Sequence, residues 1–126
     1  MSEARIVIVE DEEMVRTALE QWLRLSGFAV EAASGPREGL ALVDDIRPEA
    51  VLTDMRMPGG TGLDVLRAVR ERSATTEVIM ITGHGDVPMA VEAMREGAFD
   101  FIQKPYVPDE LVKVLRRAAE QSRLKR

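Results

Sequence analysis

The chain has 126 residues, 45% of them hydrophobic and 31% charged, which is typical of a single globular domain that can bury a core. It contains no cysteine, so disulfides and thiolate metal sites are excluded, and its net charge of -5 argues against a nucleic-acid surface on this segment. No apolar stretch is long enough to span a membrane, and the N-terminus lacks the apolar segment of a signal peptide. We therefore expect no membrane contact and a cytoplasmic location.

Strand-like and helix-like patterns alternate along the chain, with no internal repeat and no linker between them. The predicted strands are, in chain order, residues 5–10, 28–32, 50–54, 77–81 and 99–103. A helical pattern follows each strand, and the connections are short. This order predicts an α/β fold, (βα)5, with a doubly wound five-stranded parallel sheet in the flavodoxin-like order 2-1-3-4-5.

Glycine, proline and aspartate mark the ends of the predicted helices. The first helix ends at Gly27, and its Trp22 is predicted to lie in the core. Pro36 and Pro108 suit the first turns of the second and the last helix. Asp86 is the predicted N-terminal cap of the fourth helix.

The fourth predicted helix carries more apolar surface than it needs to cover one face of a sheet. The stripe predicted to face the sheet consists of Val87, Ala90, Val91 and Met94. Met89 and Ala93 add apolar surface beside it, and methionine suits adaptable binding surfaces. A wide core contact explains this pattern equally well. We predict a homodimer face formed by this helix with the last strand and the last helix, with these interface residues: Val87, Met89, Val91 and Met94.

Charged and hydroxyl side chains stand where four of the predicted strands end. Glu10 and Asp11 close the first strand, and Asp54 closes the third. Thr82 follows the fourth strand and Lys104 follows the last. Because the C-terminal ends of parallel strands meet at one edge, we expect these side chains to converge. An isolated acidic run would be a solvated loop and an isolated aspartate a helix cap, but their joint occurrence favours a ligand site.

The residue types at this edge indicate phosphoryl chemistry with a divalent cation. Neighbouring carboxylates repel one another unless a cation lies between them, and Mg2+ prefers carboxylate, carbonyl and water oxygens. Asp54 is a candidate nucleophile toward phosphorus. Lys104 would place a point charge on a phosphate oxygen, and Thr82 would donate its hydroxyl. Gly62 and the glycines before it lack the spacing of a Walker loop, and we interpret them as loop flexibility beside Asp54.

Together these residues resemble a response-regulator receiver domain of two-component signalling, over essentially the whole chain. The motifs that carry the resemblance are Val9-Glu10-Asp11-Glu12, Thr53-Asp54-Met55-Arg56-Met57-Pro58, Thr82-Gly83 and Lys104-Pro105. The resemblance implies one receiver domain over residues 1–126.

The resemblance also implies the roles of the residues at the edge. Asp54 would accept a phosphoryl group from the phosphohistidine of a sensor histidine kinase. Mg2+ would be held by Asp11, Asp54 and the backbone carbonyl of Arg56. Glu10 would lie near the metal and act through water, at a position where the family more often has an aspartate.

The same resemblance implies a conformational switch. Thr82 and Lys104 would contact the phosphoryl group, and Phe101 occupies the aromatic switch position. Because Phe101 has no hydroxyl, any switching by this residue would depend on packing rather than on a new hydrogen bond.

Residues 82–101 are similar, more narrowly, to the receivers that head NtrC-like activators of sigma-54 polymerase, such as the dicarboxylate-transport (DctD-like) type. FixJ-like regulators share much of this stretch but carry a different output domain. The resemblance implies a regulator in which phosphorylation changes dimerisation and controls a transcriptional output domain, with DNA contacted only through that domain. Residues from about 118 to 126 are predicted to begin a helical linker to it.

Two other functions were weighed against this interpretation. An aspartyl-phosphate phosphohydrolase of the haloacid-dehalogenase kind needs a second aspartate two residues after the nucleophile, where this chain has Arg56. Arginine cannot transfer a proton at neutral pH, so we expect a phosphoacceptor rather than a turnover enzyme. A free-standing receiver that acts by docking to a partner stays an alternative.

Overall fold

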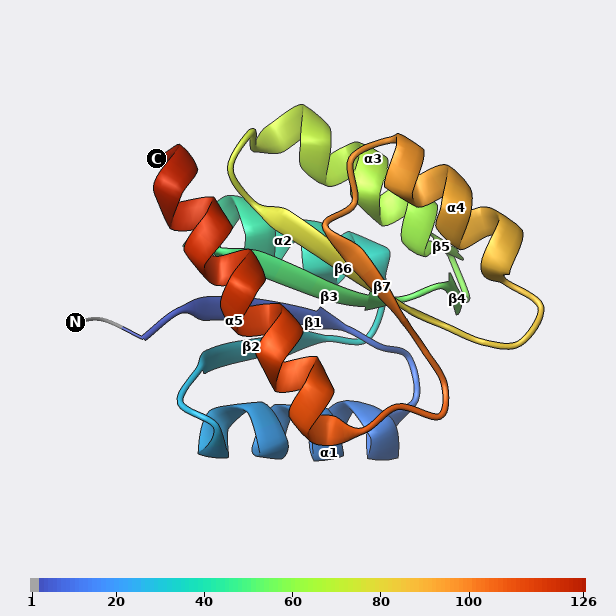
Figure 1. The fold of residues 1–126 in the computed structure, drawn as a ribbon, viewed down its shortest axis with the longest axis horizontal. Helices are drawn as coiled ribbons and strands as arrows, with labels where there is room; N and C mark the ends of the chain where they lie inside the picture. Colours follow the sequence, from blue (N-terminus) through green and yellow to red (C-terminus); the bar gives the residue numbers. More distant parts are fainter. Residues whose placement is uncertain (1–2) are drawn as a thin grey trace.

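The structure, a computed structural model, describes residues 3–126. Figure 1 shows the elements, which follow one another along the chain as β1 (Arg5–Val9), α1 (Glu13–Leu25), β2 (Ala29–Ala33), α2 (Pro36–Ile46), β3 (Ala50–Asp54), β4 (Arg56–Met57), β5 (Gly60–Thr61), α3 (Gly62–Arg72), β6 (Glu77–Thr82), α4 (Val87–Arg95), β7 (Asp100–Gln103) and α5 (Pro108–Lys125). All five predicted strands and helices are present, and the ends of the strands differ from the prediction by one residue at most.

Five strands form one parallel sheet in the order β2-β1-β3-β6-β7, which confirms the predicted topology. Ile8 of β1 lies beside Leu52 of β3, and Leu52 lies beside Ile79 of β6. Since every strand points the same way, their C-terminal ends share one edge of the sheet (Figure 1).

Helices cover both faces of the sheet, so the strands are apolar on both sides. On one face α1 and α5 enclose a core that includes Ile6, Ile8, Leu19, Leu23, Leu52, Ile79, Leu111 and Leu115. On the other face α2, α3 and α4 enclose a second core that includes Val7, Val43, Val51, Leu66, Val69, Val78, Met80 and Ala90. Figure 1 shows the two layers, with α5 crossing one face and α3 and α4 lying side by side over the other.

The segment between β3 and α3 contains a small hairpin that was predicted to be a loop. Strands β4 and β5 pair antiparallel, with Arg56 opposite Thr61. Gly59 and Gly60 in the turn have φ angles of 93° and 158°, and the first of these favours glycine. Strands of two residues carry no alternating apolar pattern, which is why the sequence did not reveal them.

The prediction that Trp22 lies in the core was wrong. Its side chain is 39% exposed, and α1 buries Leu19 and Leu23 instead. Because α1 packs mainly on the edge strand β2, only a narrow stripe of the helix is covered. Trp22 lines a shallow apolar groove of about 500 Å3 between α1 and the loop before α5, together with Met14 and Tyr106.

Ion pairs attach the last turn of α5 to the N-terminal edge of the sheet. Glu49 is buried directly before β3 and accepts hydrogen bonds from the backbone N–H of Arg5 and from Nε of Arg123, both at 3.0 Å. Lys125 Nζ lies 2.7 Å from Oε2 of Glu77, which is buried at the first position of β6. The end of α5 therefore contacts charged groups beside two different strands.

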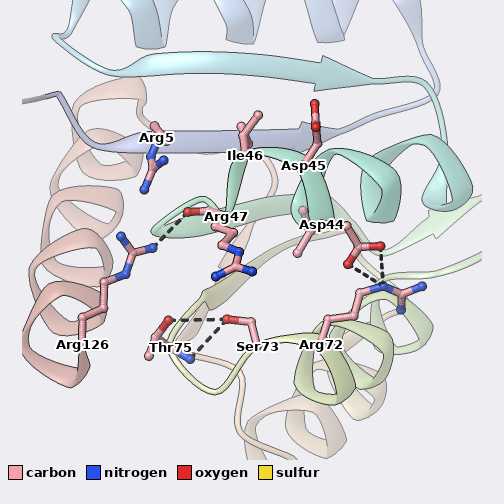
Figure 2. Close-up of a pocket in the computed structure, with 10 residues that line it drawn as sticks. Arg5, Asp44, Asp45, Ile46, Arg47, Arg72, Ser73, Thr75 and Arg126 are labelled. Atoms are coloured by element: carbon pink, nitrogen blue, oxygen red, sulfur yellow. Dashed lines mark hydrogen bonds and ion pairs between the residues drawn. The ribbon is translucent and has the colours of Figure 1, made fainter.

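A cavity of about 600 Å3 at this same edge is lined by four arginines and two hydroxyl side chains (Figure 2). The C-terminal ends of α2, α3 and α5 converge here, and the free carbonyls of helix ends attract cations. Arg126 donates from Nη2 to the carbonyl of Arg47 at 3.0 Å, and Nε of Arg72 lies 3.1 Å from Oδ1 of Asp44. Arg126 therefore satisfies a carbonyl at the end of α2, and Arg72 links α3 to α2. This edge of the sheet is opposite to the C-terminal ends of its strands.

Candidate functional site

The predicted site residues meet at the C-terminal edge of the sheet. Glu10 directly follows β1, and Asp54 is the last residue of β3. Thr82 is the last residue of β6, and Lys104 directly follows β7. Neighbouring strands of this sheet carry all four residues, so the topology alone places them around one point.

Three carboxylates form the acidic part of the site. Ligand oxygens of Glu10, Asp11 and Asp54 all lie within 4.8 Å of one another. Burial raises the pKa of Glu10, the backbone N–H of Glu12 that donates to its carboxylate at 3.0 Å lowers it, and the charge of Asp54 raises it again. The balance is a raised pKa, so burial and the nearby charge of Asp54 disfavour the ionised form of Glu10. A set of carboxylate and carbonyl oxygens fits a hard divalent cation such as Mg2+.

Asp54 is half-buried, and its carboxylate has two contacts. The backbone N–H of Met55 donates to Oδ1 at 2.9 Å, and Nζ of Lys104 lies 3.5 Å from the same oxygen. Within residues 3–126 both contacts use Oδ1, so Oδ2 is left without a donor. Asp54 thus belongs to the acidic cluster and also lies close to one ammonium group.

Thr82 contributes a buried hydroxyl that has no hydrogen-bond partner among the residues the structure describes. A buried unpaired hydroxyl is destabilising by about 1–3 kcal/mol, and this hydroxyl is free to donate to a ligand at the edge of the sheet. The carbonyl of Thr82 accepts a hydrogen bond from the N–H of Lys104 at 2.8 Å, which ties β6 to the residue after β7. The peptide bond between Lys104 and Pro105 is cis. Phe101 of β7 lies beside Met80 of β6 and packs, partly buried, against the second core.

An ion pair that the sequence did not reveal joins two loops of the site. Nε of Arg56 lies 2.5 Å from Oδ1 of Asp86, directly before α4. Asp86 stands at the N-cap position as predicted, but its carboxylate makes no capping hydrogen bond to α4. It accepts instead from Arg56 and from the N–H of Gly83, at 3.3 Å for the latter. The sequence gives only a weak indication of this pair, namely that an arginine follows β3 and an aspartate follows the neighbouring strand β6.

Comparison with known proteins agrees with this geometry. Residues 6–116 match the sequence model of the response regulator receiver domain. The chain belongs to this family. The receiver is 42% identical over 120 residues to the transcriptional regulatory protein FixJ of Rhizobium meliloti, covering 95% of this chain and 59% of FixJ.

Two further comparisons describe how far the similarity extends. The receiver is 42% identical over 123 residues to the C4-dicarboxylate transport transcriptional regulatory protein DctD of Pseudomonas aeruginosa, covering 98% of this chain and 27% of DctD. The crystal structure of a response regulator receiver domain protein from Clostridium thermocellum superposes with a TM-score of 0.94 at 33% identity, covering 98% of this chain and 99% of the other. The receiver thus spans between about a quarter and three-fifths of the length of these curated relatives. Among residues 3–126, no helix is both long enough and apolar enough to cross a bilayer.

The orientation of α4 in the receiver differs from the predicted one. Ala90 and Ala93 face the sheet and are buried, whereas Val87, Val91 and Met94 are about 40% exposed. The prediction that the latter three residues cover the sheet was wrong, because small alanines allow the helix to approach the strands closely. Met89 packs against the second core, so three of the four predicted interface residues lie on the surface of α4.

Gly62 has a specific packing role beside Asp54. A Cβ at this position would lie 3.0 Å from the backbone carbonyl oxygen of Asp54 and 3.3 Å from Cα of Met55. The N–H of Gly62 donates to the carbonyl of Met55 at 2.8 Å. For Gly62, the interpretation as loop flexibility was therefore wrong, since close approach of the helix α3 to the acceptor segment requires a residue without a side chain.

Proposed function

We propose that this receiver is the phosphoacceptor of a two-component response regulator, and that Asp54 takes a phosphoryl group from a sensor histidine kinase in a Mg2+-dependent reaction. The observation that carries this proposal is the meeting of three carboxylates within 4.8 Å of one another, with Lys104 3.5 Å from the carboxylate of Asp54. A carboxylate oxygen can attack phosphorus to give an acyl phosphate, and a bound cation would offset the negative charge of the carboxylates and the phosphoryl group.

The residues around Asp54 have separate roles in this proposal. Asp11, Asp54 and the backbone carbonyl of Arg56 would hold Mg2+, with Glu10 nearby through water. When bound, the cation would neutralise charge on the phosphoryl group. Lys104 would contact one phosphoryl oxygen, and the unpaired hydroxyl of Thr82 would donate to another.

The reaction that we propose is a single transfer rather than enzymatic turnover. A phosphohydrolase would need a general acid two residues after Asp54. Arg56 stands there, and its guanidinium is engaged with Asp86. An arginine cannot supply the proton at neutral pH.

The test is the intact mass of the protein after incubation with Mg2+ and acetyl phosphate. We expect a single phosphoryl adduct in the wild type, and none in Asp54→Asn or in wild type treated with EDTA. An adduct that persists in Asp54→Asn would contradict the assignment of the acceptor, and one that persists in EDTA would contradict the role of the metal.

We propose that phosphorylation changes dimerisation through the surface of α4, β7 and α5, with Phe101 following the movement of Thr82 by packing. The support is the apolar row of Val87, Val91 and Met94, which is exposed at helical spacing on α4. Sedimentation with and without the phosphoryl mimic beryllofluoride tests this. A protein that stays monomeric under both conditions, at concentrations well above the dissociation constant expected for a stable dimer, would argue against it.

We propose a transcriptional output domain on a longer chain, acting in the cytoplasm, with DNA contacted only through that domain. The support is the shared 42% identity with FixJ and DctD, both named as transcriptional regulators, of which this receiver spans only a part. The resemblance of residues 82–101 to DctD-like receivers favours sigma-54-dependent output. Ala118, Ala119 and Ser122 of α5 are buried, and Arg123 and Lys125 pair with Glu49 and Glu77. The linker that we predicted from about residue 118 would therefore continue from the end of α5.

A further inference from the structure

Arg56 and Asp86 connect the segment that follows Asp54 to the loop between β6 and α4. The Arg56 Nε to Asp86 Oδ1 distance is 2.5 Å, and Asp86 is 8% exposed. The other carboxylate oxygen of Asp86 accepts from the backbone N–H of Gly83. The carbonyl of Gly83 in turn accepts from the N–H of Asp86 at 3.2 Å, so this loop is closed on itself and held by Arg56.

The loop that Arg56 holds begins at Thr82, whose hydroxyl is buried and unpaired. If Thr82 moves toward a phosphoryl group on Asp54, Gly83 has to move with it, because the two residues share a peptide bond. The contacts of Gly83 with Asp86 oppose that movement, and the contact of Asp86 with Arg56 fixes them in place. Asp86 also directly precedes α4, so the same contacts connect Arg56 to the residue before that helix.

A phosphoryl group on Asp54 would compete with Asp86 for Arg56. Arg56 stands two residues after Asp54, so their Cα atoms are at most about 7 Å apart. The side chain of Arg56 is 65% exposed and therefore has room to turn. The phosphoryl group brings up to about two negative charges and can bind a guanidinium through two parallel hydrogen bonds, whereas Asp86 brings one charge.

We propose that Asp86 is a positioning residue whose ion pair with Arg56 holds the β6–α4 loop in its unphosphorylated arrangement. A phosphoryl group on Asp54 draws Arg56 away from Asp86, and the released loop lets Thr82 reach the phosphoryl oxygen. This inference rests on the proposed phosphorylation of Asp54. It assigns to the side chain of Arg56 a role separate from that of its backbone carbonyl.

The chain offers a matched control at the other end of α4. Arg67 donates from Nε and Nη2 to the two carboxylate oxygens of Glu96, both at 2.7 Å. This pair also joins α4 to the segment after β3, but it lies at the C-cap of α4 rather than at the loop that holds Thr82. Loss of the Glu96 pair removes an ion pair from α4 without touching the β6–α4 loop.

The test compares the wild type with Asp86→Asn, Asp86→Glu and Glu96→Gln, each titrated with beryllofluoride in the presence of Mg2+. The amide signals of Thr82 and Gly83 in a two-dimensional NMR spectrum report saturation, and intact mass with acetyl phosphate is measured on the same proteins. Asparagine keeps an acceptor for the N–H of Gly83 and is as good an N-cap residue as aspartate, so Asp86→Asn breaks the pair with Arg56 and leaves the contact within the loop in place.

We expect the half-saturating beryllofluoride concentration to fall about fivefold in Asp86→Asn, which corresponds to about 1 kcal/mol for a partly exposed ion pair. It should stay within about twofold of wild type in Glu96→Gln, and Asp86→Glu should return toward the wild-type value. In Asp86→Asn without mimic, the Gly83 amide signal should already lie part of the way toward its saturated position.

The outcomes separate this inference from the proposed function. An adduct on Asp54 together with equal half-saturation in wild type and Asp86→Asn would overturn the positioning role and leave the phosphoacceptor assignment standing. An equal fall in the half-saturating beryllofluoride concentration of Glu96→Gln would also overturn it, because the loss of any ion pair on α4 would then have the same effect. A wild type that forms no adduct and shows no response to beryllofluoride would overturn both.

Discussion

Replacing Glu49 by glutamine should weaken the attachment of the last turn of α5 to the sheet. Glu49 is 3% exposed and accepts from the backbone N–H of Arg5 and from the guanidinium of Arg123. Glutamine has nearly the same shape and still accepts from the N–H of Arg5. It places a neutral amide against Arg123, so the charge-assisted hydrogen bond is lost.

The expected size of the effect follows from these contacts. A hydrogen bond to a charged group contributes about 1.5–3 kcal/mol. The side chains of Arg5 and Arg123 are 42% and 40% exposed, so solvent screens part of the interaction and the lower half of that range applies. We expect Glu49→Gln to lower the free energy of unfolding by about 2 kcal/mol at pH 7, out of the about 5–15 kcal/mol of a typical domain.

The effect should depend on pH with a definite sign. Burial opposes ionisation of Glu49, but the hydrogen bonds from Arg5 and Arg123 and the charge of Arg5 outweigh it, so its pKa lies below the ordinary 4.5. A lowered pKa stabilises the folded state at pH values above 4.5, and this stabilisation is lost as the pH falls through the pKa of the folded state. The stability difference between wild type and Glu49→Gln should therefore be level from pH 7 to about 5 and shrink at lower pH.

Urea unfolding followed by far-UV circular dichroism, at a series of pH values, measures this difference. Glu120→Gln is the matched control, because Glu120 is exposed on the same helix, and it should stay within about 0.5 kcal/mol of wild type. A difference for Glu49→Gln below about 0.5 kcal/mol at pH 7 would refute the reasoning, as would a difference that does not shrink in acid.

Three further outcomes are expected. A Cβ at Gly39 would lie 2.6 Å from Cγ2 of Val9, so Gly39→Ala should lower the free energy of unfolding in urea by about 1–3 kcal/mol, and an unchanged midpoint would contradict this packing. A Cβ at Gly62 would push against the carbonyl of Asp54, so Gly62→Ala should slow adduct formation with acetyl phosphate about tenfold in a mass time course, and a wild-type rate would show that the acceptor had not moved. Mg2+ should raise the melting temperature of the wild type but not of Asp11→Asn, since a ligand that binds only the folded state stabilises it; equal shifts would argue against Asp11 as a metal ligand.

Much of the fold and most of the site were predictable because the signals are local. Each strand is a short apolar run that ends in charge, and the rules for parallel crossovers leave few sheet orders. Once the order 2-1-3-4-5 is inferred, Glu10, Asp54 and Lys104 have to share an edge. The structure places them there, with oxygens of Glu10 and Asp54 within 4.8 Å of each other and Nζ of Lys104 3.5 Å from the carboxylate of Asp54.

The errors came from positions whose environment depends on distant parts of the chain. Helical periodicity marks an apolar stripe, but it does not say which of two adjoining stripes meets the sheet. On α4 the alanines Ala90 and Ala93 face inward, and Val91 is left outside. On α1, packing mainly against the edge strand β2 leaves Trp22 partly exposed.

The amino-acid sequence by itself determined the alternation of strands and helices, the sheet order and the edge at which Asp54 lies, because these follow from short-range pattern and chain connectivity. Only the tertiary structure decided the pairing of Arg56 with Asp86, the attachment of Glu49 to Arg123 and the close approach of Gly62 to Asp54. The first two contacts join groups 30 and 74 residues apart, and the energy of such a contact depends on distances of a few ångströms that no local pattern specifies.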